Sequence, residues 1–297
     1  MHQHPLAEVF GFPIDNGSDR ANRYRKHRLC PYNNRVPNCT KDKANSPLGV
    51  CSIFTGAHSI AITCPIRFRQ DWLIVEEAAA FFFPPAANWT SLGEMRLNDR
   101  SGRSAGNVDL VLVSYDDRGR VTDFGTLEVQ AVYVSGNIRQ PFEYYMEDPA
   151  GRYDLDWTSQ PNYPRPDYLS SSRKRLVPQL IYKGGILRHW GIKQAVALHA
   201  EFFRTLPALP EVEPQEADMI WLVYDLAYDS EQKLYHLRLE RTAHTLFRPV
   251  LDQIMTAEPG PVEEFIGVLQ EKLDKKLEGE DNPPDAPTLA DLLRQDS

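Results

Sequence analysis

The sequence predicts an α/β (α+β) fold, and three observations support it. The chain has 297 residues, of which 42% are apolar and 25% are charged, a balance typical of a globular protein with a sizeable core. Apolar residues alternate over short segments in the middle of the chain and follow a helical spacing before and after them. The predicted elements run in the order helix, three strands, helix, strand, which is the order of a compact α/β core.

The first part of the chain predicts little regular structure. Residues 1–19 are interpreted as a loose lead-in, and residues 20–67 as a cysteine-rich region that ends in a short strand at 59–63. Residues 69–83 have helical spacing, with Trp72, Val75 and Ala79 on one face, and the pair Pro84-Pro85 ends this helix.

The central part predicts a three-stranded unit followed by further α/β elements. Strands are expected at 89–97, 107–115 and 122–132, with a turn at 116–119 joining the last two. Helices are expected at 138–146 and from 168 to 181, where serines at 170–172 provide an N-cap cluster. Later strands are predicted at 193–203, 220–228 and 234–241, and helices at 244–255 and 261–277, before a polar linker at 279–287 and a helical turn at 288–293. We therefore divide the chain into residues 1–68, a core at 69–256 and an acidic helical segment at 257–297.

Charge is unevenly distributed along the chain. The net charge is −8, but the acidic segment carries 11 acids against 4 bases, a net of −7. Residues 20–43 hold eight Lys and Arg against one Asp, and residues 168–200 hold six and no acid. These two basic zones indicate a surface for a polyanion, with two merely solvated surfaces as the alternative. The candidate polyanion contacts, which would be DNA contacts in a nucleic-acid-binding protein, are Arg28, Arg35, Lys41, Arg173, Lys174 and Arg175.

Targeting signals are not evident. The longest apolar cluster, at 78–83, is far too short to cross a bilayer, and the first 30 residues contain no apolar signal core. We therefore expect a cytoplasmic protein of a prokaryotic cell, with no membrane partner.

The four cysteines, Cys30, Cys39, Cys51 and Cys64, all lie in the first 64 residues. Their region is rich in turn formers and poor in periodic apolar residues, so a linkage other than an apolar core is expected to hold it together. A chain without an export signal disfavours disulfides, and four thiolates suit one structural zinc or iron ion. Two disulfides and unlinked buried thiols remain the alternatives.

Candidate catalytic groups lie on the central hairpin. Asp109 lies on the second strand and Glu128 and Gln130 on the third, where residues two apart face the same side. Pairing through the 116–119 turn sets Asp109 near Glu128. Two carboxylates and an amide oxygen suit Mg²⁺ with waters retained, and Glu94 is a further candidate acid. A solvent-facing hairpin is the alternative, but the apolar run at 110–113 predicts burial, and a buried carboxylate needs a partner or a metal.

This D…E-x-Q hairpin resembles the PD-(D/E)xK nuclease superfamily, in a variant where Gln130 replaces the usual lysine. With Glu94 upstream and four cysteines ahead of the core, the chain is similar to the NotI-type restriction endonucleases. The resemblance spans residues 29–198 and is carried by LCPYNNRVPNCTK, PLGVCS, NVDLVLV, TLEVQAVYVSG and SRKRLVPQLIYKGGILRHWGIKQAVAL.

The resemblance implies a PD-(D/E)xK core, with a mixed β-sheet flanked by helices, behind a small N-terminal metal-binding module. It implies that the four cysteines bind one structural Fe or Zn ion. It also implies a nuclease site of Glu94, Asp109, Glu128 and Gln130, with Mg²⁺ on Asp109 and Glu128. The expected activity is that of a type II, Mg²⁺-dependent restriction endonuclease, an endodeoxyribonuclease that cuts double-stranded DNA at a palindromic, GC-rich site as a homodimer.

Two other functions are compatible with parts of the sequence. A metal-containing DNA-binding module with a degenerate nuclease core is one, although the complete set of acids disfavours it. A four-thiolate iron protein for electron transfer is the other, and the absence of C-x-x-C pairs argues against it. His189 and Trp190 are interpreted as core or surface packing residues, with a base contact as the alternative.

Overall fold

The computed structural model describes residues 4–33, 36–43, 46–56, 59–256 and 259–277. The chain forms two compact units, Met1–Met255 and Thr256–Ser297. Across those described ranges, none of the helices combines the length and the apolar character that a membrane span requires. The predicted linker at 279–287 and helical turn at 288–293 lie outside the described residues.

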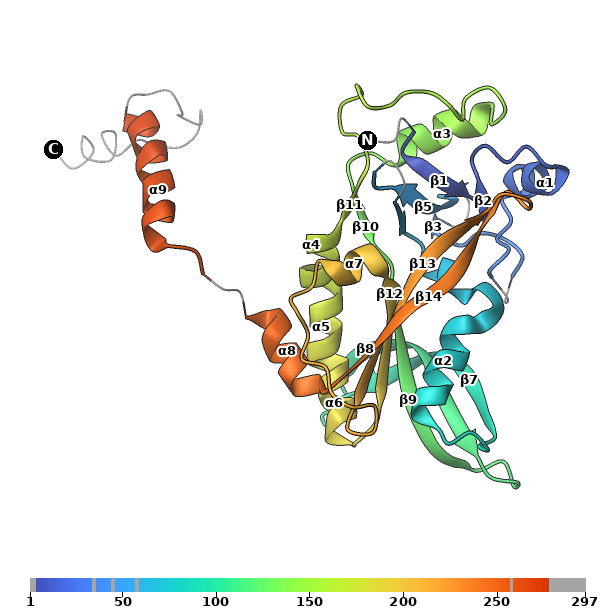
Figure 1. Cartoon of the computed structure of the whole chain (residues 1–297), viewed down its shortest axis with the longest axis vertical. Coiled ribbons are helices and arrows are strands. Elements are labelled where there is room, and N and C mark those ends of the chain that lie inside the picture. The colour runs from blue at the N-terminus through green and yellow to red at the C-terminus, as the bar shows by residue number, and fades with distance from the viewer. Residues whose placement is uncertain (1–3, 34–35, 44–45, 57–58, 257–258, 278–297) are drawn as a thin grey trace. The chain divides into compact units, whose positions relative to one another are not determined.

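A six-stranded mixed sheet forms the centre of the first unit, in the order β14-β13-β12-β9-β8-β7 (Figure 1). The β12 strand runs parallel to both β9 and β13, and the other pairs are antiparallel. The predicted α+β class with a mixed sheet flanked by helices is therefore confirmed. The strands are β7 (Trp89–Asn98), β8 (Ser104–Tyr115), β9 (Val121–Gln130), β12 (Gln194–His199), β13 (Met219–Asp229) and β14 (Leu234–Thr245).

Helix α2 (Leu73–Phe82) covers one face of this sheet, as its apolar spacing predicts. It follows a 3₁₀ segment, η1 (Pro65–Trp72), so the predicted helix at 69–83 begins as a tighter turn. Gly125 lets the helix come close to β9, because a Cβ at that position would lie 2.3 Å from the Phe82 ring. Leu110, Leu112 and Leu127 pack with α2 in the same buried cluster.

One long helix covers the opposite face and connects β9 to its parallel neighbour β12 (Figure 1). It runs through α4 (Tyr168–Ser171), η2 (Ser172–Leu176), α5 (Val177–Gln179), η3 (Leu180–Gly184) and α6 (Gly185–His189). Both η segments are π-helical turns, and Pro178 lies between them. Proline lacks the N–H that would bond the carbonyl four residues earlier, and its ring clashes with that carbonyl, which gives a physical reason for the wider turn at 172–176. We call residues 168–189 the crossover helix; it packs against α8 (Phe247–Met255).

The N-terminal residues form a second sheet, contrary to the predicted loose lead-in. Strands β1 (Leu6–Val9), β2 (Phe12–Pro13), β5 (Val50–Phe54) and β6 (Ile60–Ile62) pair antiparallel in the order β2-β1-β5-β6. Leu6, Val9, Val50 and Ile53 belong to the buried cluster that holds Val196 and Trp221 of the central sheet, and Ile60 and Ile62 belong to the cluster around α2. The expectation that this region lacks an apolar core is therefore wrong, and no unit boundary falls near residue 68.

The remaining elements connect these layers. The predicted strand at 193–203 ends early, because the His199 side chain caps α7 (Ala200–Arg204) by accepting a hydrogen bond from the Glu201 N–H at 3.3 Å. The other elements are α1 (Asp19–His27), β3 (Asp42–Lys43), β4 (Ser46–Pro47), β10 (Tyr133–Ser135), α3 (Arg139–Glu147), β11 (Arg165–Asp167) and, in the second unit, α9 (Val262–Leu277).

Candidate active site

Two carboxylates meet where strands β8 and β9 separate. Regular pairing of these strands ends at Leu110 and Leu127, one residue before Asp109 on β8 and Glu128 on β9. At this point the Asp109 side chain takes the place of a backbone partner, because its Oδ2 accepts the Val129 N–H at 2.9 Å. The hairpin register and this local hydrogen bond bring the two acids together, as the sequence predicts.

Burial gives the pair unusual electrostatics. Glu128 is 8% exposed, and its Oε1 is buried with no hydrogen-bond partner in the described part of the chain. Burial and, to a smaller extent, the neighbouring Asp109 carboxylate raise the pKa of Glu128 to about 7. Lys183 opposes this effect, since its Nζ lies 2.7 Å from Glu128 Oε2. The site therefore holds two acids that repel each other and one oxygen that lacks a donor.

Lys183 is the site residue that the sequence reasoning missed. It is only 4% exposed, and its Nζ also donates to the Asn107 carbonyl at 2.7 Å. Lys183 belongs to the basic zone at 168–200, but it differs in burial from the predicted DNA contacts of that zone. Arg173, Lys174 and Arg175 are all exposed. The signal that could have identified it is a single lysine inside the apolar stretch LIYKGGIL of the crossover helix.

Gln130 and Glu94 occupy different surroundings. Gln130 is 4% exposed, lies on the same face of β9 as Glu128, and donates from Nε2 to the Ala131 carbonyl at 2.9 Å. The pairing of its neighbours sets Glu94 opposite Asp109 across the β7–β8 ladder. Glu94 is exposed and has a left-handed φ of 43°, and it does not join the two acids in a cluster of three ligands among the described residues.

The paired acids suit a hard divalent cation. Mg²⁺ in proteins commonly takes one or two carboxylates, retains waters and completes its shell with substrate phosphate. Within the described ranges, no three His, Cys, Asp or Glu side chains form a metal-ligand cluster, so a cation here would rely on two carboxylates. The buried, unpartnered Oε1 of Glu128 fits such a ligand position.

The four cysteines lie near one another: Cys51 is on β5, Cys64 directly precedes η1, and Cys30 and Cys39 lie between α1 and β3. All are free thiols, and Cys39, Cys51 and Cys64 are buried. Burial, and after it the neighbouring Cys64 and Cys39, raises the pKa of Cys30 to about 11. Burial, and after it neighbours that include Cys64, Cys30 and Cys39, raises the pKa of Cys51 well above its usual value. The four thiols are therefore within electrostatic range of one another, although, as placed, they do not form a metal-ligand cluster among the described residues.

The candidate DNA-contacting residues differ in availability. Arg173, Lys174 and Arg175 are exposed on the crossover helix, and Arg28 is exposed at the end of α1. The Lys41 ammonium donates to the carbonyls of Val50 and Thr63 at 2.7 and 3.1 Å, and to the Thr63 hydroxyl, so the protein itself occupies its donors. Arg35 lies outside the described residues.

A groove of about 1010 Å³ lies between the β7–β8 turn and the crossover helix, and its lining includes Tyr182, the residue before Lys183. Arg100 and Arg103 line one wall. Tyr182, 67% exposed, and Trp190, 52% exposed, lie on the other wall with His189. Both His189 and Trp190 are exposed, which excludes packing in the core and leaves surface packing or a base contact. Arginines pair with phosphates, and aromatic rings stack on bases, so this groove has the chemistry of a nucleic-acid contact.

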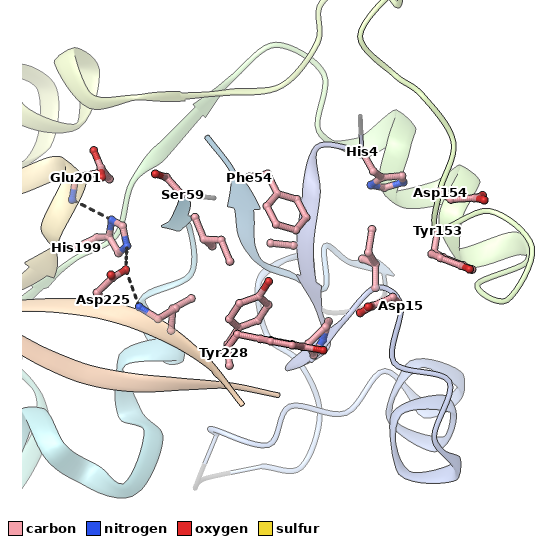
Figure 2. A pocket seen from close by; sticks show the side chains of 16 residues that line it. His4, Asp15, Phe54, Ser59, Tyr153, Asp154, His199, Glu201, Asp225 and Tyr228 are labelled. Atoms are coloured by element: carbon pink, nitrogen blue, oxygen red, sulfur yellow. Dashed lines mark hydrogen bonds and ion pairs between the residues drawn. The ribbon is translucent and has the colours of Figure 1, made fainter. Parts of the chain in front are cut away.

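A second cavity, of about 610 Å³, has the opposite character. Figure 2 shows His199 hydrogen-bonded to Asp225 and to the Glu201 backbone, with Asp15 and Asp154 also on the lining. Four carboxylates would repel a phosphate backbone, and both His199 ring nitrogens have hydrogen-bond partners within the protein. The groove lined by Arg100 and Arg103 is therefore the better candidate for DNA.

Comparison with known proteins identifies the family of the chain. The restriction endonuclease NotI family model matches residues 8–237, which include the cysteines, the β8–β9 hairpin and the crossover helix. No curated protein matches the chain. Because the family match covers well over half of the sequence, the chain belongs to the NotI restriction endonuclease family.

Proposed function

We propose that this protein is a type II restriction endonuclease that hydrolyses double-stranded DNA with Mg²⁺ at the Asp109–Glu128 pair. Membership of a restriction endonuclease family supports site-specific cleavage of DNA, and the action of such an enzyme lies inside the cell. The observation that carries the proposal is the meeting of two buried or half-buried acids where β8 and β9 separate, with one carboxylate oxygen left without a donor.

Asp109 and Glu128 would hold the cation. Hydrolysis of a phosphodiester adds the oxygen of one water to phosphorus and expels an alkoxide, and bound Mg²⁺ activates water and neutralises the charge that develops. The protein's own contribution is to fix the two carboxylates through the Val129 N–H and the Lys183 ammonium. The Gln130 amide donates to the Ala131 carbonyl. Because this side chain is neutral, it would orient the water or the metal ion rather than transfer a proton.

The exposed basic residues would position the DNA backbone over this site. Arg173 and Lys174 lie on the same helix as Lys183, and Arg100 and Arg103 line the adjacent groove. Replacing Arg173 and Lys174 by glutamine should weaken DNA binding at all sequences and reduce the salt dependence by about one unit per lost phosphate contact. An unchanged salt slope would place the DNA backbone elsewhere.

We further propose that the four cysteines bind one structural Fe or Zn ion and that the protein acts as a homodimer. The mutual proximity of the thiols supports the first proposal, and the raised pKa values of Cys30, Cys39 and Cys51 mean that metal binding must release protons. Elemental analysis should find about one ion per chain in the wild type and less in Cys39→Ser. A dimer follows from function, because a palindromic site matches two-fold symmetry.

The central experiment compares cleavage with binding. Wild-type protein should convert a GC-rich plasmid into discrete bands with Mg²⁺ and bind it without cutting in Ca²⁺. Asp109→Asn should lower the cleavage rate at least about 100-fold, because a metal site contributes several kcal/mol to the transition state, while binding in Ca²⁺ persists.

Asp123→Asn is the matched control, since Asp123 is an exposed acid on the same hairpin. It should cut at the wild-type rate. A smear would indicate a nonspecific nuclease, and an intact but gel-shifted plasmid would favour a DNA-binding module without cleavage. Wild-type cleavage by Asp109→Asn would remove Asp109 from the active site.

A further inference from the structure

We propose that Lys183 is a positioning residue of the nuclease site, which holds Glu128 by one carboxylate oxygen and supplies the positive charge that neutral Gln130 cannot supply. The inference rests on the proposed function, because it takes Asp109 and Glu128 as the groups that act on DNA. It extends that function by assigning a role to a residue from the crossover helix, far from the hairpin in the sequence.

Geometry ties Lys183 to both strands of the site. Its Nζ donates to Glu128 Oε2 on β9 and to the Asn107 carbonyl on β8, each at 2.7 Å. Asn107 precedes Asp109 by two residues, so the ammonium bridges the two strands where they separate. With Oε2 occupied, Oε1 remains the oxygen of Glu128 that is free of protein donors in the described part of the chain. The lysine therefore orients the carboxylate as well as neutralising it.

Charge explains why a buried cation belongs at this place. A lysine side chain normally keeps its ammonium in water, and burying it is costly unless it is paired. Lys183 is 4% exposed, and the acids that face it are Glu128 and, next to Glu128, Asp109. The site would carry two negative charges without the lysine and one with it. Such a balance leaves a net attraction for a cation while limiting repulsion of the DNA phosphate.

The crossover helix is built to deliver this side chain. Lys183 lies in the second π-helical turn, η3, and π-turns occur often at functional sites because an added residue redirects the side chains that follow. The next residue, Gly184, lets the turn lie against α8, since a Cβ there would come within 2.4 Å of the Phe247 ring. An ordinary α-helix with a larger residue at 184 would move Lys183 away from the site.

The test removes the positive charge of Lys183 in one variant and restores a positive charge at position 130 in a second variant. Lys183→Met should lower the single-turnover cleavage rate in Mg²⁺ about 10–100-fold, the usual effect of losing a group that orients a metal ligand. Its affinity for the same DNA in Ca²⁺ should stay within about threefold of wild type, because Lys183 is buried. Adding Gln130→Lys to Lys183→Met returns a lysine to the same face of β9 as Glu128, and should recover at least about tenfold in rate.

Lys193→Met is the matched control. Lys193 also donates to a backbone carbonyl, that of Phe81 at 2.9 Å, and within the described part of the chain its ammonium forms no hydrogen bond or ion pair with Asp109, Glu128 or Lys183. It should cut at the wild-type rate. Because Lys183→Met leaves a buried carboxylate without its partner, thermal unfolding is recorded for every variant. Lys183→Arg keeps the charge in a larger planar group, so it should remain folded and cut more slowly than wild type.

The outcomes separate the two proposals. A wild-type protein that does not cut DNA refutes the proposed function before any variant is made. A wild type that cuts, together with Lys183 variants that fold and cut equally well, refutes only the role of Lys183. Loss of DNA binding in parallel with cleavage, or no recovery on adding Gln130→Lys, would likewise show that Lys183 serves the fold rather than the site.

Discussion

Replacing Asp109 by asparagine should stabilise the metal-free protein while it abolishes cleavage. Burial, and after it the Asp109 carboxylate, raises the pKa of Glu128, which means that the folded protein disfavours the charged form of Glu128. An asparagine keeps a side-chain oxygen for the Val129 N–H, now accepted by Asp109 Oδ2 at 2.9 Å, and removes the negative charge. We therefore expect Asp109→Asn to unfold at a higher temperature than wild type in EDTA.

The magnitude follows from the pKa of Glu128, which rises from 4.5 to about 7. A tenfold change in proton affinity corresponds to about 1.4 kcal/mol, so the full effect on the free energy of unfolding is on the order of 3 kcal/mol. Burial is the larger cause, and we assign about 1 kcal/mol to Asp109, equivalent to about 3 °C in Tm. Because the folded pKa is raised, the stability associated with protonated Glu128 is present below the unfolded pKa and is lost as the pH rises through about 7.

Thermal unfolding by circular dichroism in EDTA, at about pH 5 and about pH 8, measures this difference. The unfolding temperature of Asp109→Asn should exceed that of wild type only slightly at the lower pH, where Glu128 is protonated. The difference should reach its full size at the higher pH, where Glu128 is charged in wild type. Asp123→Asn, an exposed acid of the same hairpin, should show no comparable gain at either pH. Equal midpoints for Asp109→Asn and wild type at about pH 8 would refute the idea that the two carboxylates repel each other.

Two further predictions concern the scaffold. Gly184→Ala should lower the free energy of unfolding by about 1–3 kcal/mol, because the new Cβ would meet the Phe247 ring at 2.4 Å, whereas Gly185→Ala has open space and should gain up to about 1 kcal/mol of helix propensity. Chemical denaturation of both variants measures the contrast, and equal stabilities would contradict the packing argument. Arg67→Met should cost about 3–5 kcal/mol, since it leaves the fully buried Glu8 carboxylate without its ion-pair partner, and a Tm close to wild type would contradict this.

Local patterns explain most of the elements that the sequence predicted correctly. The helix at 69–83, the strands of the β8–β9 hairpin and the strands at 220–228 and 234–241 all lie close to the observed elements. Each is a segment in which apolar periodicity and turn residues agree, so neighbouring residues alone carry the information. The same periodicity brought Asp109 and Glu128 together, because hairpin register is set by the turn and the strand lengths.

The errors occur where distant segments supply the burial. Residues 6–9 and 12–13 form strands although their own pattern is weak, because Leu6 and Val9 pack with Val196 and Trp221 from the far end of the chain. Turn-forming residues around the cysteines suggested a region without a core, but β5 and β6 complete the N-terminal sheet there. Burial of this kind depends on contacts between residues far apart in sequence, which periodicity does not report.

The sequence by itself determined the α/β class, the hairpin that holds Asp109 and Glu128, and the resemblance that the NotI family match bears out. Only the tertiary structure shows that the ammonium group of Lys183 pairs with the Glu128 carboxylate. Lys183 lies 55 residues from Glu128 in the chain, and a π-helical turn of the crossover helix brings its ammonium to 2.7 Å from that carboxylate. The physical reason is that a buried charge is stable only when an opposite charge lies beside it. Here the packing of the crossover helix on the sheet places the Lys183 ammonium beside Glu128.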